Sequence, residues 1–208
     1  MILYDYPRSS AAFRVRIALN LKNINYDRVV VSLLEQEQHA TDFALLNPNA
    51  SVPVLLTDEG AISQSMAIIE YLEDISPSPS LLPFHRLDKA RCRSIAQLIS
   101  TDIHPLNNLR VLNYLSNTLQ ISDEHKMTWY HHWIARGFAA IDKMIHSNQT
   151  PYCCANTPTV ADVCLIPQLY NARRFQLDLT PYPKLLDIES ACLALPAFSD
   201  AHPDNLME

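Results

Sequence analysis

Two serines near the start of the chain stand where a strand pattern gives way to a helix pattern. Ser9 and Ser10 follow the short apolar run of residues 1–4 and precede Phe13 and Ile17, which are apolar at a spacing of four. A serine just before the first helical residue accepts a hydrogen bond from a free helix N–H group, so Ser9 or Ser10 is the expected N-cap.

Arginines flank these serines and make the start of this helix a candidate anion site. The first N–H groups of a helix have no partner within the helix, and they carry a partial positive charge. Arg8 and Arg14 add full positive charges beside them. This combination favours an anion at the helix N-terminus. A plain helix cap is the alternative, and these residues alone leave both open.

Composition and charge narrow the class of protein. The 208 residues are 48% hydrophobic and 18% charged, which allows a sizeable core in one or two domains. The net charge of −6 argues against a nucleic-acid-binding protein, which would show a basic face. No run of apolar residues is long enough to span a membrane, and the start of the chain lacks the pattern of a signal peptide. We therefore expect a cytoplasmic protein.

Cysteine and glycine usage excludes several kinds of site. The five cysteines are an odd number, so a disulfide framework is not expected. The adjacent pairs Cys153-Cys154 and His131-His132 have poor spacing for metal ligands, and no metal site is expected. The chain has only two glycines, which rules out a glycine-rich dinucleotide fingerprint and a P-loop.

The first part of the chain alternates strands and helices. Hydrophobic patterning predicts strands over 1–6, 26–32, 52–57 and 60–62, and helices over 10–22, 38–46 and 64–74. A β-α-β unit followed by a hairpin and a helix indicates a small α/β layer fold.

A segment rich in serine and proline, residues 76–80, separates this part from an all-helical one. The expected domains are 1–80 and 85–208. Helices are predicted over 87–119 with a bend near Pro105, and over 123–146, 159–175 and 184–195. Residues 202–208 are predicted to form a frayed tail.

Two local motifs have structural consequences. Thr159 and Asp162 have the spacing of a capping box before an apolar run, so Asp162 is expected to be structural and not an acid catalyst. Pro53 stands at the start of a predicted strand, where a missing N–H group is tolerated. A cis peptide bond at Val52-Pro53 would turn the backbone of Val52 outward, although only about 5% of such bonds in folded proteins are cis.

These motifs together resemble the cytosolic glutathione transferases, and among them the zeta class. The most specific matches are the segments 8–19 and 178–183, whereas Val52-Pro53 and Gln64-Ser65 are shared by many transferases. Further matches are the segments 46–48, 64–72, 81–83 and 105–109. The resemblance covers nearly the whole chain. It implies a thioredoxin-like α/β domain at the N-terminus, an all-α domain at the C-terminus, and a homodimer.

The resemblance also implies glutathione as the cofactor, in a groove of the first domain. Val52, next to Pro53, would pair its backbone with the cysteinyl unit, and Gln64 and Ser65 would hold the γ-glutamyl carboxylate. The other positions that it assigns to this site are Ser9, Ser10, Ala11, Arg14, Gln38, His104, Asn108 and Arg110.

The activity implied is the glutathione-dependent cis–trans isomerisation of maleylacetoacetate to fumarylacetoacetate in tyrosine and phenylalanine catabolism. A thiolate adds to the conjugated double bond, the resulting single bond rotates, and the thiolate leaves. Ser9, with Ser10 second, is the expected donor that keeps the thiol ionised. Arg8 and Arg174 are the expected ligands of the two substrate carboxylates.

Two departures from the family leave alternatives open. Ala11 stands where the family usually has a cysteine, so a mixed disulfide with glutathione cannot form there. His104 stands where the family tends to have glutamine. The alternatives are a maleylpyruvate isomerase, a general glutathione transferase for conjugation or dehalogenation, and a non-catalytic binding protein of the same fold.

Overall fold

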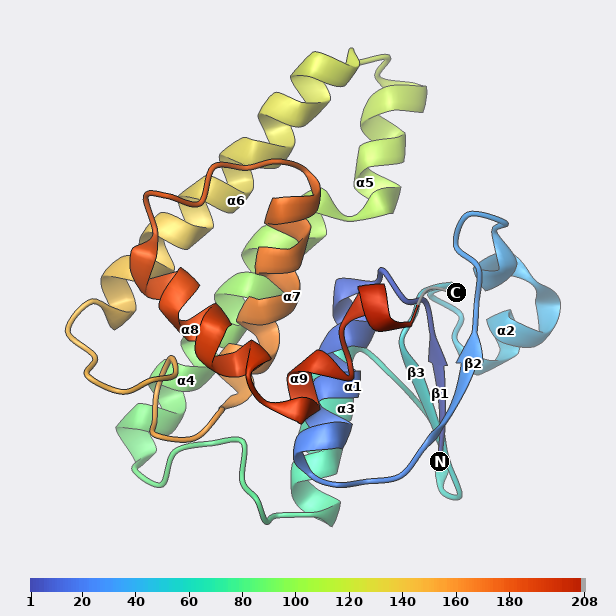
Figure 1. Ribbon diagram of the computed structural model, residues 1–208. Helices are drawn as coiled ribbons and strands as arrows, with labels where there is room; N and C mark the ends of the chain where they lie inside the picture. The colour runs from blue at the N-terminus through green and yellow to red at the C-terminus, as the bar shows by residue number, and fades with distance from the viewer. Residues whose placement is uncertain (207–208) are drawn as a thin grey trace. The chain divides into compact units, whose positions relative to one another are not determined.

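The computed structural model describes residues 1–206, which form two compact units (Figure 1). One unit combines Met1–Leu81 with the chain from Leu193 onward, and the other is Leu82–Cys192. The two are described separately below.

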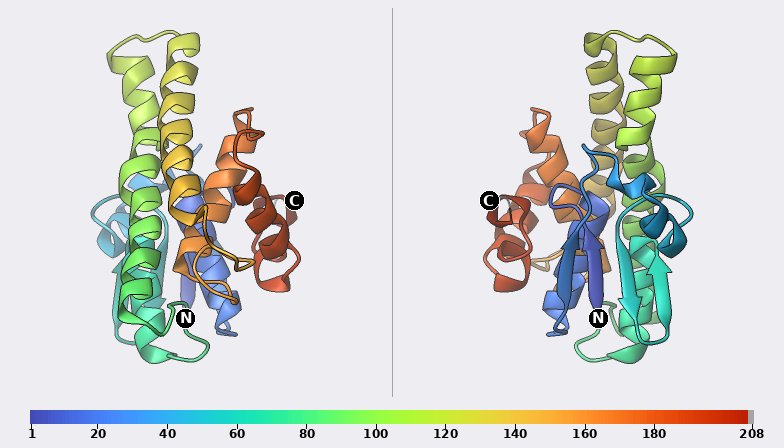
Figure 2. Two further views of the ribbon diagram at one scale, coloured as in Figure 1. Left: turned by 90° about the vertical axis from the view of Figure 1, so that its left-hand side faces the viewer. Right: turned by 90° about the vertical axis from the view of Figure 1, so that its right-hand side faces the viewer.

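A four-stranded mixed sheet with the order β2-β1-β3-β4 is the framework of the first unit, and its strands are seen together in the right-hand view of Figure 2. The strand β1 (Ile2–Asp5) pairs parallel with β2 (Asp27–Val30) and antiparallel with β3 (Val54–Thr57). A hairpin joins β3 to β4 (Gly60–Ser63). This is the predicted α/β layer arrangement.

The helices α1 (Ser10–Leu21) and α3 (Ser65–Ile75) pack side by side on one face of the sheet (Figure 1). Almost the whole of α1 is buried, from Ala12 to Leu19, including two arginines. Such a helix lies at the centre of its unit, so its N-terminus is held by packing along its entire length.

The predicted helix over 38–46 is wrong in its first part. A 3₁₀ turn, η1 (Glu37–His39), is followed by Ala40 in an extended conformation and then by α2 (Thr41–Leu46). No side chain caps α2, and Phe43 is its one buried residue. A short helix with so small an apolar face gains little from continuing through the preceding turn.

The end of the chain is packed and not frayed, as far as residue 206. A short helix, α9 (Pro196–Ser199), contacts α1, and Asn20 Nδ2 donates to the carbonyl oxygen of Ala197 at 3.1 Å. The ring of His202 meets the ring of Phe13 edge-on, with 5.8 Å between their centres. The tail prediction is therefore wrong for residues 202–206, and residues 207 and 208 lie outside the described residues. The expected domain 85–208 also differs from the structure, because the segment from Leu193 belongs to the first unit.

The second unit is helical. Its longest helices are α4 (Arg86–Gln97), α6 (Asp123–Ile145), α7 (Val160–Arg174) and α8 (Pro183–Leu193). The left-hand view of Figure 2 shows α6 beside α4 and its continuation. The first twelve positions of α7 are buried except Tyr170, so α7 forms the core of this unit.

The single helix predicted over 87–119 is interrupted. It continues from α4 through a π-helical turn, η2 (Leu98–Ile103), and a 3₁₀ turn, η3 (His104–Asn107). Asn108 is then extended, and its side-chain oxygen accepts the N–H of Arg110 at 3.1 Å. An asparagine that caps a new helix competes with helix continuation, so α5 (Leu109–Asn113) starts afresh before η4 (Tyr114–Thr118).

The predicted capping box at the start of α7 is confirmed. Asp162 Oδ2 accepts from the N–H and the hydroxyl of Thr159, both at 2.7 Å, and its other oxygen accepts the N–H of Cys153 at 2.7 Å. Asp162 is fully buried and its oxygens are satisfied locally, which is a structural role.

Within residues 1–206, no helix combines the length and the apolar character that crossing a bilayer requires. The same residues contain no group of three or more side chains placed to hold a metal ion.

Candidate active site

Ser9 is the N-cap of α1, and Ser10 is the first residue of the helix. Ser9 Oγ accepts the backbone N–H of Ala12 at 3.2 Å. A hydroxyl that accepts in this way still has its own hydrogen to donate. Ser10 is buried, whereas Ser9 is partly exposed. Of the two serines, Ser9 has the geometry to donate to an anion at the helix N-terminus.

A buried arginine connects this helix to the N-terminus of α3. Arg14 is 1% exposed, and its Nη1 donates to Ser65 Oγ at 3.3 Å. Ser65 opens α3, and the exposed Gln64 before it has a φ of 72°, in the left-handed region. A helix N-terminus backed by a buried guanidinium is suited to a carboxylate.

Two further predicted positions lie in the first unit. The Val52-Pro53 peptide bond is cis, and Val52 is buried in a cluster with Val31, Phe43 and Val54. Gln38, in η1, has its side-chain Oε1 buried without a hydrogen-bond partner among residues 1–206. A buried amide oxygen of this kind can accept a ligand N–H group, so the hydrogen-bonding groups of the first unit fit a peptide-like ligand such as glutathione.

His104, Asn108 and Arg110 belong to the second unit. His104 Nε2 lies 3.4 Å from Asn108 Nδ2, and the backbone of Arg110 bonds to the side chain of Asn108. Asn108 thus organises all three positions at the break between η3 and α5.

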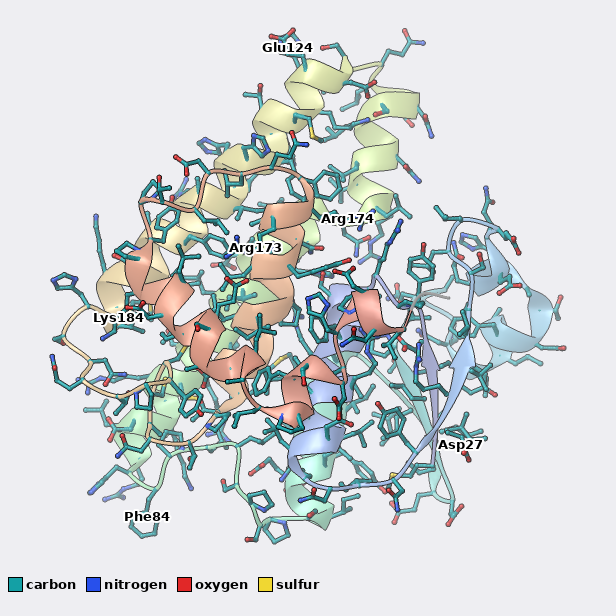
Figure 3. The ribbon with its side chains drawn as sticks, viewed as in Figure 1. Asp27, Phe84, Glu124, Arg173, Arg174 and Lys184 are labelled. Atoms are coloured by element: carbon teal, nitrogen blue, oxygen red, sulfur yellow. The ribbon has the colours of Figure 1, made fainter. Side chains whose placement is uncertain are left out.

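Arg173 and Arg174, both labelled in Figure 3, are neighbours at the end of α7. They differ in what they contact. Arg173 Nε donates to Glu189 Oε1 at 3.1 Å. The guanidinium of Arg174 lies over the Phe175 ring, 5.1 Å from its centre, and no carboxylate of residues 1–206 pairs with it. Arg174 is therefore the better candidate for an external carboxylate, as the sequence resemblance implies. Arg8 is exposed on the first unit.

Sequence reasoning missed one group beside the serines. Asp5 and Arg16 are both fully buried and are joined by a 2.6 Å ion pair directly below the turn that leads to Ser9. The sequence signal for this ion pair was that both charged residues stand among apolar ones, because charged side chains are seldom fully buried unless they are paired.

Comparisons with known proteins identify the family of the chain. The family model for the N-terminal domain of glutathione S-transferase matches residues 1–74. A probable maleylacetoacetate isomerase of Vibrio cholerae is 46% identical over 207 residues, which cover 99% of this chain and 96% of that protein.

Solved structures are similar over the whole chain. The holo structure of a maleyl pyruvate isomerase, described as a bacterial zeta-class glutathione S-transferase, has a TM-score of 0.95 at 41% identity, and covers 98% of this chain and 97% of that one. A maleylacetoacetate isomerase of Anaeromyxobacter dehalogenans, with dicarboxyethyl glutathione and citrate in its active site, has a TM-score of 0.87 at 40% identity and covers 98% and 90%. At 46% and 41% identity to these relatives over nearly its whole length, the chain belongs to the zeta-class glutathione transferase and maleylacetoacetate isomerase family.

Proposed function

We propose that this protein catalyses the glutathione-dependent cis–trans isomerisation of maleylacetoacetate to fumarylacetoacetate. The observation that carries the proposal is the position of Ser9, whose hydroxyl caps α1 and retains a hydrogen for an anion. Bound glutathione supplies the thiolate that adds to the double bond of the substrate and leaves after rotation.

The residues of the first unit hold the tripeptide and favour its ionised sulfur. The start of α3, with Gln64, Ser65 and the buried Arg14, takes the γ-glutamyl carboxylate. The side-chain oxygen of Gln38 accepts an N–H group of the ligand, and the backbone of Val52 pairs with the cysteinyl unit. Ser9 donates to the sulfur, and the partial charge of the helix N-terminus lowers the thiol pKa further.

Substrate carboxylates need cationic partners that no internal carboxylate neutralises. Arg174 meets this condition. Arg8, which precedes Ser9 in the chain, is the second expected ligand. A guanidinium binds a carboxylate through two parallel hydrogen bonds, which fixes its orientation as well as its charge. The glutathione adduct of a dicarboxylate in the Anaeromyxobacter relative supports this class of substrate.

Maleylpyruvate is the second candidate substrate, because relatives at 41% and 42% identity are named for it. A third candidate function is general conjugation or dehalogenation, which would use the same thiolate of glutathione. We further propose that the protein is a cytoplasmic homodimer that serves tyrosine and phenylalanine catabolism, as the resemblance implies.

The test is an isomerisation assay with purified protein, with and without glutathione, on maleylacetoacetate and on maleylpyruvate. Formation of the fumaryl isomer only in the presence of glutathione supports the proposal, and the ratio of kcat/KM values selects the substrate. Conjugation of electrophiles without isomerisation would assign a general transferase. Failure to bind glutathione in calorimetry would assign a non-catalytic protein.

A further inference from the structure

Arg16 lies inside the first unit, and each part of its guanidinium contacts a different segment of the chain. The side chain is fully buried on α1. Nη1 donates to Asp5 Oδ1 at 2.6 Å, at the end of β1. Nη2 donates to the carbonyl oxygen of Pro7 at 2.9 Å, and Nε donates to the carbonyl oxygen of Ala201 at 3.0 Å. One side chain thus joins the central strand, the turn before Ser9 and the C-terminal segment.

The charges of this group are arranged to keep the guanidinium in place. Burial lowers the pKa of Arg16, and the carboxylate of Asp5 opposes that effect. Asp5 also accepts Arg28 Nε at 2.9 Å, so both of its oxygens are occupied. A buried ion pair often stabilises a fold no more than apolar side chains of the same volume would. The geometry that the pair imposes on the neighbouring turn is therefore a better account of it than a gain in stability.

The bond to Pro7 fixes the orientation of the turn. In a planar trans peptide the C=O and N–H groups point in opposite directions. Because the oxygen of Pro7 is directed at Arg16, the N–H of Arg8 points away from it. The next residue, Ser9, is tied back by its own N–H to the oxygen of Tyr6 at 2.8 Å. The backbone of the turn is therefore fixed by bonds on the side that faces Arg16, whereas the N–H of Arg8 faces the opposite side.

We propose that Arg16 is a positioning residue for the reaction: it holds the turn from Asp5 to Ser9 so that the Ser9 hydroxyl meets the sulfur of glutathione, and the carbonyl of Ala201 completes this support. The proposal rests on the function proposed above. It adds a role for the C-terminal segment, because the carbonyl oxygen of Ala201 accepts from Arg16.

The first test compares Arg16→Lys with Arg28→Met. Lysine keeps a positive charge near Asp5 but lacks the planar fork that reaches Pro7 and Ala201. We expect kcat to fall by about 10- to 100-fold in Arg16→Lys, because small misplacements of a catalytic group have effects of that size. The pKa of the bound glutathione thiol, read from thiolate absorbance, should rise towards that of free thiol. Arg28→Met loses a contact to Asp5 only, and it should keep the kcat and the thiol pKa of the wild type.

The second test removes the support of Ala201 and leaves Arg16 unchanged, so that it remains informative if Arg16→Lys does not fold. A deletion of residues 200–208 should lower kcat and raise the thiol pKa. A matched deletion of residues 206–208 keeps Ala201 and should change neither.

A third measurement is independent of activity. Hydrogen exchange of the Ser9 and Ala12 amides, which bond to Tyr6 and to the Ser9 hydroxyl, should accelerate in Arg16→Lys, while the Ile68 amide of α3 should not change. If unfolding becomes easier but kcat, the thiol pKa and these two amides stay as in the wild type, Arg16 is only structural and the proposal is wrong. An inactive wild type that does not bind glutathione would instead overturn the proposed function, and the exchange data would still decide the role of Arg16.

Discussion

Ser9 and Ser10 are chemically identical, yet their surroundings assign them different tasks. Ser9 lies before the helix, where its oxygen accepts an N–H bond and its hydrogen stays available. Ser10 lies inside the first turn and is buried. The difference is one position along the chain, and it decides which hydroxyl can face a ligand at the end of the helix dipole.

Replacing Ser9 by alanine should therefore affect both turnover and stability. We expect kcat to fall by about 100-fold, in the range found when one donor to a developing anion is removed. The free energy of unfolding should fall by about 1 kcal/mol because the cap is lost. Steady-state kinetics and denaturant titration measure the two effects. Ser10→Ala is the control and should retain turnover; equal activity of Ser9→Ala and wild type would refute the assignment.

Ala11 limits the chemistry of the site. It is the second residue of α1, where a thiol would benefit from the helix N-terminus. We expect Ala11→Cys to form a mixed disulfide with glutathione and to gain reduction of dehydroascorbate, which the wild type should lack. Mass spectrometry and a reductase assay test this. A variant that shows neither product would place Ala11 away from the glutathione sulfur.

At the scale of elements, the start of α7 depends on the fully buried carboxyl group of Asp162. Burial raises the pKa of Asp162, and the N–H groups of Cys153 and Thr159 only partly oppose this. The folded protein therefore binds the Asp162 proton more tightly than the unfolded chain does. Its stabilising contribution is complete below the unfolded pKa and is lost as the pH rises through the raised folded value.

We expect this dependence in the difference between wild type and Asp162→Asn, which cannot titrate. The free energy of unfolding of the wild type, relative to the variant, should decrease as the pH rises from 3.8, the ordinary value for the group. Denaturant titrations over this range give the curve. A difference that grows with pH would mean that the three hydrogen bonds outweigh burial.

The packing of α6 on η2 requires a residue without a side chain. A Cβ atom at Gly137 would lie 2.1 Å from Ile103 Cδ1 and 2.4 Å from its Cγ1. Alanine would favour the helix by about 1 kcal/mol, but overpacking typically costs about 1 to 3 kcal/mol. We expect Gly137→Ala to lower thermal stability. The double variant with Ile103→Ala should be less destabilised than the sum of the two single variants, and simple additivity would contradict the contact.

For the whole molecule, large apolar side chains remain exposed on the single chain. Phe84 is 92% exposed, Leu45 80% and Leu34 75%. Each of these side chains is a candidate contact of the proposed homodimer. Sedimentation equilibrium should give twice the chain mass of 23.6 kDa. A mass of one chain at micromolar concentration would contradict the proposal.

Local patterns in the sequence were sufficient for most elements and for two motifs, the serine cap and the Thr159–Asp162 box, because both involve residues within one helical turn. The break at Ala40 was missed, because weak periodicity decides it. Near Asn108 a bend at Pro105 was predicted, but the fresh start of a capped helix was not, because a local side-chain cap decides it. Contacts between distant segments were not accessible either. Arg14 and Ser65 are 51 positions apart, and Arg16 and Ala201 are 185 apart, so no spacing rule predicts them. The glutathione and substrate residues came from the resemblance and remain predictions.

The return of the chain from Leu193 to α1 has a consequence for biosynthesis. The ribosome releases the sheet and its first helices early, but the carbonyl groups of Ala197 and Ala201 emerge only after the whole helical unit has been translated. Until then Asn20 Nδ2 and Arg16 Nε lack these two acceptors. The first unit is thus the first to be synthesised, but it gains its last contacts only when the C-terminal segment has been made.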